Sequence, residues 1–198
     1  MTTKTKIEYN EKRMIELILY IGAKCGLDEH YGVLKLNKIL FFSDFQAFRT
    51  RGKPITGAEY AKLPNGPAPR GMKRLRKTLE VSGDAFEYKN PLASFNDDGE
   101  QMVEKRLLTI RKPEIDSVLD PEEIAIVDQV IERLRHMTGT EVSDLSHRQR
   151  GWHLVEMDET IPYHMALLPE EGRPRISAAD FRRAKKMADE LSAVASAA

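Results

Sequence analysis

Cysteine is nearly absent from the sequence, and this scarcity excludes two kinds of protein. Cys25 is the single cysteine among 198 residues, so neither an internal disulfide framework nor a metal site of several cysteines can form. Cys25 lies in an apolar stretch with helical spacing, where a free cysteine is usually a small buried hydrophobic residue. We therefore interpret Cys25 as a core residue, with a reactive thiol as the alternative.

The sequence also lacks a predominant charge, a secretion signal and a membrane-spanning run. Basic and acidic residues both number 31, so no overall field draws the chain to nucleic acid or to an anionic membrane. Residues 1–6 contain no apolar core of a signal peptide. No apolar run is long enough to cross a bilayer. We expect a cytoplasmic protein without a membrane partner, and a dedicated DNA-binding protein is disfavoured.

Motifs of the common enzyme classes are missing as well. The sequence has neither a glycine-rich phosphate loop nor a Gly-x-Ser-x-Gly elbow. The five histidines are His30, His136, His147, His153 and His164. None belongs to a recognised metal signature, and no catalytic residue, metal site or cofactor is expected. The acidic pair Asp97-Asp98 has loop chemistry, and Glu122-Glu123 suits the positive end of a helix.

One stretch has a local structure that its residue types determine more strongly than elsewhere in the chain. It begins with an apolar helix expected over residues 33–49. Its four phenylalanines lie within eight residues: Phe41, Phe42, Phe45 and Phe48. A helix that is apolar on nearly every side belongs in the centre of a core. Asp44 lies among these rings and needs hydrogen-bond partners if it is buried. We interpret Asp44 as structural, with a catalytic base acting together with a distant histidine as the alternative.

A corner rich in proline and glycine follows this helix. Gly52 is expected to end the helix, and Pro54 prevents it from resuming. Next comes a short extended segment that contains Gly57 and Tyr60. The corner itself is Pro64-Asn-Gly66-Pro67-Ala-Pro69, in which the prolines fix φ and Asn-Gly forms a turn. We interpret Gly57, Pro64, Gly66 and Pro67 as structural, and we place Tyr60 at the rim of a partner-binding surface.

A basic helix is expected to begin at Ala68 or Pro69. Five basic residues are expected on its outer face: Arg70, Lys73, Arg74, Arg76 and Lys77. Such a run is most often a solvated helix face. The alternative is a surface for an acidic partner or nucleic acid, and on that reading Arg70, Lys73, Arg74 and Lys77 are candidate partner-binding residues.

The remaining elements can be placed from their periodicity and their capping residues. Before the central helix, residues 10–26 form an amphipathic helix that ends in a left-handed cap at Gly26. Residues 84–112 are expected to form a two-stranded ribbon whose connection is a loop from Asn90 to Gly99. A helix starts after Asp120, a shorter one after Thr140, and a last one near Ser177.

These elements predict a mainly α fold with a small β element (α+β), and their order resembles a winged helix. We divide the chain into a flexible start (1–9), a domain (10–157), and a loop with a C-terminal helix packed on that domain (158–198). Within the domain, His147 beside Ser146 is expected to cap or hydrogen-bond a helix end. Trp152, the single tryptophan, is expected to bury its ring, with a partner-binding anchor as the alternative.

Three motifs together resemble one known family. They are the helix Leu36-Asn-Lys-Ile-Leu-Phe-Phe-Ser-Asp-Phe45, the segment Gly52-Lys-Pro-Ile-Thr-Gly-Ala-Glu-Tyr60, and the corner Leu63-Pro-Asn-Gly-Pro-Ala-Pro69. They look like the Panacea domain, the SocA-like antitoxin domain of bacteria and phages. Ser146, His147 and Trp152 match a later Ser-His and Trp of that pattern. Phe41 stands where the family usually has tyrosine, and this change removes only a hydroxyl group.

The resemblance covers about residues 10–155 and implies a function. It implies an antitoxin of a toxin–antitoxin system, also found in prophages, which binds and neutralises a toxin encoded beside it. The SocA member hands its toxin to the ClpXP protease, so a proteolytic adaptor is one form of this function. A winged-helix-like DNA-binding regulator is the alternative, with the basic helix in the groove and the ribbon as the wing.

Overall fold

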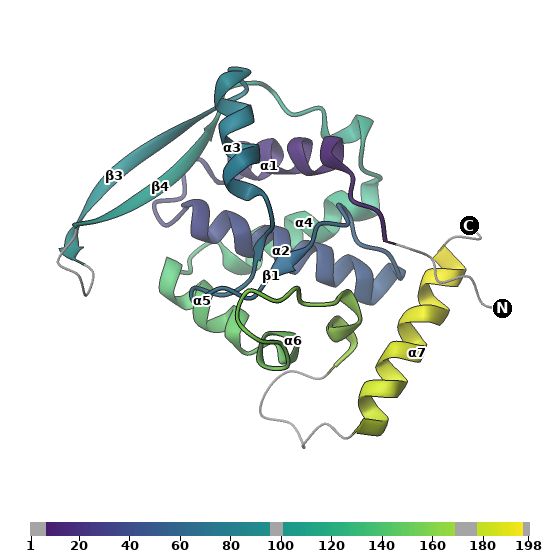
Figure 1. Cartoon of the computed structure of the whole chain (residues 1–198). Coiled ribbons are helices and arrows are strands. Elements are labelled where there is room, and N and C mark those ends of the chain that lie inside the picture. Colours follow the sequence, from purple (N-terminus) through teal and green to yellow (C-terminus); the bar gives the residue numbers. More distant parts are fainter. Residues whose placement is uncertain (1–6, 96–100, 169–177, 196–198) are drawn as a thin grey trace.

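Helix α2 (Val33–Arg51) runs through the centre of the computed structural model, which describes residues 7–95, 101–168 and 178–195 (Figure 1). Helices α1 (Glu11–Cys25), α4 (Pro121–Leu134) and α5 (Gly139–His147) all pack against it. The α2 side chains are therefore buried on nearly every side, and Phe41 and Phe48 are 1% and 2% exposed. The predicted central helix is confirmed.

The remaining described elements are short or lie outside this helical centre. In chain order they are β1 (Tyr60–Ala61), β2 (Ala68–Pro69), α3 (Met72–Val81), β3 (Ala85–Phe95), β4 (Gln101–Thr109), η1 (Ile115–Ser117), α6 (Arg150–His153), η2 (Tyr163–Leu167) and α7 (Ala178–Ala195). Strands β1 and β2 form one antiparallel pair, and β3 and β4 form another. The fold is mainly α with a small β element, as predicted.

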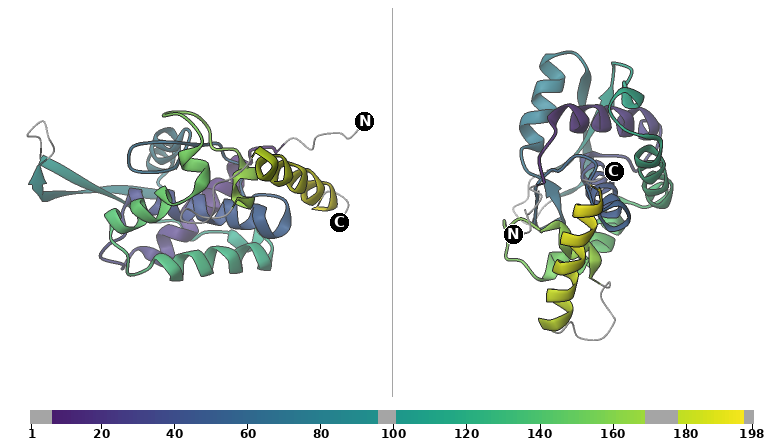
Figure 2. Two further views of the ribbon diagram at one scale, coloured as in Figure 1. Left: turned by 90° about the horizontal axis from the view of Figure 1, so that it is seen from below. Right: turned by 90° about the vertical axis from the view of Figure 1, so that its right-hand side faces the viewer.

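The β3–β4 ribbon and α7 extend the molecule at opposite ends. The ribbon projects away from the helices, whereas α7 lies at the far end (Figures 1 and 2). Helix α7 packs on η2 and α2, with Ala184 and Ala188 buried. No described helix is long and apolar enough to cross a membrane.

Residues 158–168 lie against the core beyond the predicted domain end at residue 157. The backbone N–H of Ile161 donates to the carbonyl of Tyr60 at 2.8 Å, which adds a bridge on the free side of β1. Ile161 and Met165 are buried in the same hydrophobic core as α2.

Of two predicted left-handed helix caps, one is confirmed and the other is wrong. Gly52 has φ +73° and donates its backbone N–H to the Phe48 carbonyl, so the left-handed cap predicted there is confirmed. The left-handed cap predicted at Gly26 is wrong, because Gly26 has φ −57°. The chain leaves α1 through a right-handed turn, in which the N–H of Asp28 donates to the Cys25 carbonyl.

Two predicted helix starts are also wrong. Ala68 and Pro69 pair with β1 as a strand, and the basic helix α3 begins only at Met72 after a left-handed Gly71. Thr138, and not Thr140, caps α5, because its hydroxyl accepts from the Glu141 N–H while Glu141 bonds back to Thr138. The start predicted at Asp120 is confirmed by the same kind of reciprocal capping, here with Glu123.

The ribbon is longer than predicted. Residues 90–95, expected to belong to a loop, continue strand β3, and Pro91 lies opposite Val103. The ladder shifts register between Pro91 and Phe95, which accommodates a residue without a backbone N–H. At its other end β4 stops at Thr109, three residues before the predicted end. Asp97-Asp98, expected in the loop, lies outside the described residues.

Candidate partner-binding surface and its buried support

Three charged residues of α2 are buried in the core. Lys35, Lys38 and Asp44 are each at most 1% exposed. A buried charge is unfavourable unless hydrogen bonds or an opposite charge compensate it. Each of the three side chains bonds to a different connecting segment, so the central helix holds those segments in place. Sequence reasoning singled out only Asp44, although Lys35 and Lys38 stand out in the same way as charges in an apolar helix.

Asp44 accepts hydrogen bonds from three residues that lie after α2 in the chain. One carboxylate oxygen accepts from the backbone N–H of Thr56 at 2.7 Å. The other accepts from the hydroxyls of Thr56 at 2.5 Å, Tyr60 at 2.8 Å and Tyr163 at 3.2 Å. The Tyr163 hydroxyl also lies 2.7 Å from the Ala58 carbonyl. The carboxylate therefore joins α2 to the extended segment before β1 and to η2.

The environment of Asp44 fits a structural acceptor better than a catalytic base. Burial raises the pKa of Asp44, while the bonds from Thr56, Tyr60 and Tyr163 oppose that rise. Burial also raises the pKa of Tyr60 and Tyr163 well above the ordinary value, so both hydroxyls stay protonated as donors. The carboxylate is fully buried, which leaves a substrate no access to it.

Lys38 holds the proline–glycine corner. Its Nζ donates to the Pro67 carbonyl at 3.0 Å, and burial lowers its pKa to about 7. Gly66 has φ +85°, and a Cβ added there would collide with the Ser146 hydroxyl and the Lys38 side chain. The corner therefore fits directly onto α2 and α5, and glycine is required at residue 66 for both conformation and space.

His147 and Trp152 lie beside the same corner. Their rings stack with centroids 4.2 Å apart, and His147 is hydrogen-bonded to the Pro64 backbone. Burial and the neighbouring Lys38 lower the pKa of His147. The Lys62 ammonium lies 4.4 Å from the centre of the Trp152 ring, which is a cation–π contact. Trp152 is half-buried, so part of its ring packs inward and part remains accessible.

Lys35 fixes the opposite end of α2. Its Nζ donates to the Asp28 carboxylate at 2.7 Å and to the Arg135 carbonyl at 3.0 Å. It lies in a surface cavity of about 700 Å³ that Cys25 and His136 also line. Cys25 is 5% exposed, and burial raises its pKa to about 11, so its thiol stays protonated. The described residues contain no group of three or more possible metal ligands.

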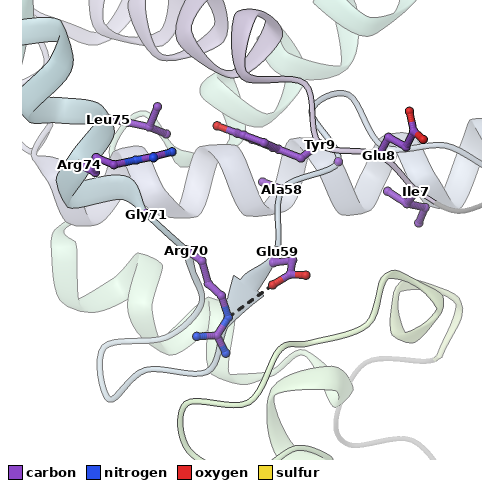
Figure 3. Close-up of a pocket in the computed structure, with 10 residues that line it drawn as sticks. Ile7, Glu8, Tyr9, Ala58, Glu59, Arg70, Gly71, Arg74 and Leu75 are labelled. Carbon is purple, nitrogen blue, oxygen red and sulfur yellow. Dashed lines mark ion pairs between the residues drawn. The ribbon is translucent and has the colours of Figure 1, made fainter.

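The basic residues near α3 border a surface groove of about 560 Å³ (Figure 3). The groove lies between residues 7–9, 57–59 and 70–75, and Arg74 extends across it toward Tyr9. Arg70 lies at one end. Its Nε donates to the Thr160 hydroxyl at 3.1 Å, and Glu59 is 3.7 Å away. The tight approach of the Glu8 backbone to Gly57, which has φ +70°, sets the position of the N-terminal segment.

The structure divides the candidate partner-binding residues. Lys73, Arg74 and Lys77 are exposed on α3, and Arg70 is partly exposed just before it. Tyr60 is 1% exposed, so its predicted place at a surface rim is wrong: the ring packs among Phe41, Phe45 and Tyr163.

Arg76 was also expected on the outer face of the basic helix, and this is wrong. Its side chain is mostly buried, and its guanidinium pairs with Glu87 of β3. Because α3 packs against β3, the face that carries Arg76 points toward the ribbon and not toward solvent.

Most of the residues gathered around α2 lie within one region matched by a family comparison. The model of the family described as "Antitoxin SocA-like, Panacea domain" matches residues 36–153. The chain belongs to this family. Its matched region includes Lys38, Asp44, the corner and the stacked pair His147 and Trp152, whereas Tyr163 lies beyond it. Comparisons with curated proteins and with solved structures gave no significant match. Membership of this family supports an antitoxin-type role.

Proposed function

We propose that the chain is the antitoxin of a toxin–antitoxin pair, acts in the cytoplasm, and neutralises its toxin by binding it directly. The family match over residues 36–153 carries this proposal. The motif residues support it because they meet in the core and hold surface segments in fixed positions. Preorganised segments of this kind reduce the entropy that binding must overcome.

Co-expression tests the proposal. The protein encoded next to this chain is expressed from an inducible promoter, alone and together with the chain. We expect growth arrest in the first case and restored growth in the second, with a complex of the two purified proteins on size exclusion. A neighbouring protein that is harmless alone, or that forms no complex, contradicts the proposal.

A proteolytic adaptor makes a different prediction in the same assay. Neutralisation by direct binding needs only the complex, so it persists in cells that lack the ClpXP protease. An adaptor loses its effect in such cells, and the toxin then accumulates. Growth together with the toxin level, measured by immunoblotting with and without the protease, separates the two modes.

The charges around α3 favour a protein partner over DNA. Arg74 lies 3.6 Å from Glu11, and Lys77 lies 3.4 Å from Glu80. Acidic side chains among the basic ones weaken attraction to a polyanion. If the chain were a DNA-binding regulator, it would bind its own promoter with strong salt dependence, and reversing Arg74 and Lys77 would abolish that binding.

A further inference from the structure

The β3–β4 ribbon has two faces of different character. Its far part projects beyond the helices (Figures 1 and 2), whereas β4 stays beside them as far as Glu104: the Arg106 side chain donates to the Asp28 carbonyl, and Glu104 lies against Gly32. In an antiparallel pair, directly opposed residues lie on the same face, and so do residues two apart. Ala85 and Leu107 are buried, and Glu87 pairs with Arg76 of α3, so these residues define the face that packs on the helices.

The opposite face carries large apolar side chains exposed to solvent. Phe86 is opposite Leu108, and Tyr88 continues the same face. Ile110 follows the end of β4 and falls on this face by alternation with Leu108. Phe86 is 50%, Tyr88 45% and Ile110 66% exposed, and Leu108 is half-buried. The ribbon thus presents an apolar stripe outward, which ends where Arg106, opposite Tyr88 on the same face, donates to the Asp28 carbonyl. A contiguous exposed apolar stripe marks a protein-interaction surface more often than isolated exposed side chains do.

The inner face changes character farther along the ribbon, level with Gly32 at the start of α2. There Lys89 lies directly opposite Lys105, and both are exposed. Like charges opposed across two strands destabilise a ribbon. Neither lysine forms an ion pair with any residue that the structure describes. The pair therefore places two positive charges on a projecting element, where they attract an acidic surface.

The size of the stripe indicates the shape of the partner. Phe86, Tyr88 and Ile110 leave on the order of 300 Å² of apolar surface, taking about 200 Å² for each side chain when fully exposed. A stable interface needs roughly 800 Å² from each protein. A flat partner that touched only this face would fall short, whereas a partner that encloses both faces would add the lysine face.

We propose that the ribbon is the part of the antitoxin that enters a cleft of the toxin. One wall of that cleft is apolar and contacts Phe86, Tyr88, Leu108 and Ile110. The other wall is acidic and contacts Lys89 and Lys105. This inference rests on the proposed function, and it names the surface and the chemistry of the toxin that the ribbon fits.

Binding of the purified neighbour-encoded protein tests the two faces separately. We expect the double variant F86S/Y88S to weaken binding at least tenfold by calorimetry. K89E/K105E should weaken it at least tenfold at low salt and by a smaller factor at high salt, because salt screens the charges. Matched controls are L154S, which changes a side chain that is also 50% exposed, and K12E/K53E, which reverses two exposed lysines away from the ribbon and α3. Both controls should stay within threefold of the wild type.

Further readouts separate the possible failures. All variants should keep a single cooperative urea transition, and the midpoint of K89E/K105E should match that of the wild type, since both lysines are exposed. A photo-crosslinking residue at Tyr88 should capture the toxin, and one at Leu154 should not, which keeps the test valid if F86S/Y88S fails to fold. Ribbon variants that bind like the wild type overturn the inference and leave the antitoxin function intact. Ribbon variants that lose binding to duplex DNA but still bind the toxin like the wild type overturn the inference too. If the wild type itself does not bind, both proposals fail.

Discussion

At the scale of the residue, Asp44 is the side chain with the largest expected effect on stability. Replacing it with alanine removes the acceptor for the buried Thr56 N–H and for the hydroxyls of Thr56 and Tyr60, whereas the Tyr163 hydroxyl keeps the Ala58 carbonyl. We expect D44A to lower the free energy of unfolding by about 3 kcal/mol or more, because each stranded buried donor costs about 1–3 kcal/mol.

Asp128 provides the control for D44A. It also accepts from a tyrosine hydroxyl and a lysine, yet its side chain is 42% exposed. D128A should cost about 1 kcal/mol or less, because water replaces the lost partner. Urea denaturation compares the two variants, and equal losses would contradict the role assigned to Asp44.

Lys38 gives the protein a particular dependence on pH. Its pKa is about 7 in the folded chain, and the ordinary value is 10.5. Between these values the unfolded chain holds the proton and the folded chain does not, so the contribution of Lys38 to stability rises with pH across that window. We expect the free energy of unfolding of K38M, minus that of the wild type, to fall from pH 7 to pH 10. Urea denaturation at several pH values measures it, and a constant difference would contradict the assignment.

Gly66 allows conformation and space to be tested separately. Gly66 and Gly83 both have positive φ, but an added Cβ collides with Ser146 and Lys38 only at Gly66. We expect G83A to cost about 1 kcal/mol from backbone strain alone. G66A should cost at least about 2 kcal/mol more, because Lys38 and Ser146 are buried and cannot move freely. Similar melting temperatures for the two variants would show that the corner does not pack as tightly as described.

At the scale of the element, α5 shows which threonine caps the helix. T138A removes the reciprocal capping bonds with Glu141, so it should cost about 1 kcal/mol. T140A changes an exposed threonine within the first turn and should have little effect. Thermal unfolding of both variants distinguishes them, and a larger loss in T140A would contradict the observed cap.

Elements were predictable where a single local pattern determines the structure. The apolar run of α2, the Asp120 cap and the left-handed Gly52 each follow from residues close in sequence. Predictions were wrong where the deciding partner is distant in the chain, or where two neighbouring residues suit the same local role equally well. Ala68 and Pro69 are a strand because Tyr60 and Ala61 lie beside them, and Thr138 and Thr140 are equally suitable caps by type. Pro91 suggested a loop, yet proline is tolerated in a ribbon with open edges.

At the scale of the whole molecule, residues 158–168 complete the core. The ring of Tyr163 packs on Phe45 and Phe48, and its hydroxyl reaches Asp44. A chain that ends after Leu168 should therefore fold, with a lower melting temperature because α7 is missing. A chain that ends after Met157 should lose cooperative unfolding. Circular dichroism during heating tests both, and a cooperative transition in the shorter chain would contradict this role.

The sequence did not reveal this part of the site because its members are remote from one another. Tyr163 follows a stretch of loop composition, and nothing near it indicates a polar partner in a helix more than a hundred residues earlier. Tyr60 was placed at the surface for a related reason: tyrosine suits both an interface and a buried hydrogen bond. Its neighbours in the core decide between the two, and they are brought together only by the fold.

The hydrogen bonds of Asp44 also have a consequence for the order of folding. Thr56 and Tyr60 lie 12 and 16 residues from Asp44 in the chain, whereas Tyr163 lies 119 residues away. Closing a long loop costs more entropy than closing a short one, so nearby partners meet first. We expect the carboxylate to be shielded in two stages, first by its local donors and last by Tyr163. The arrival of Tyr163 would then mark the moment at which the domain closes.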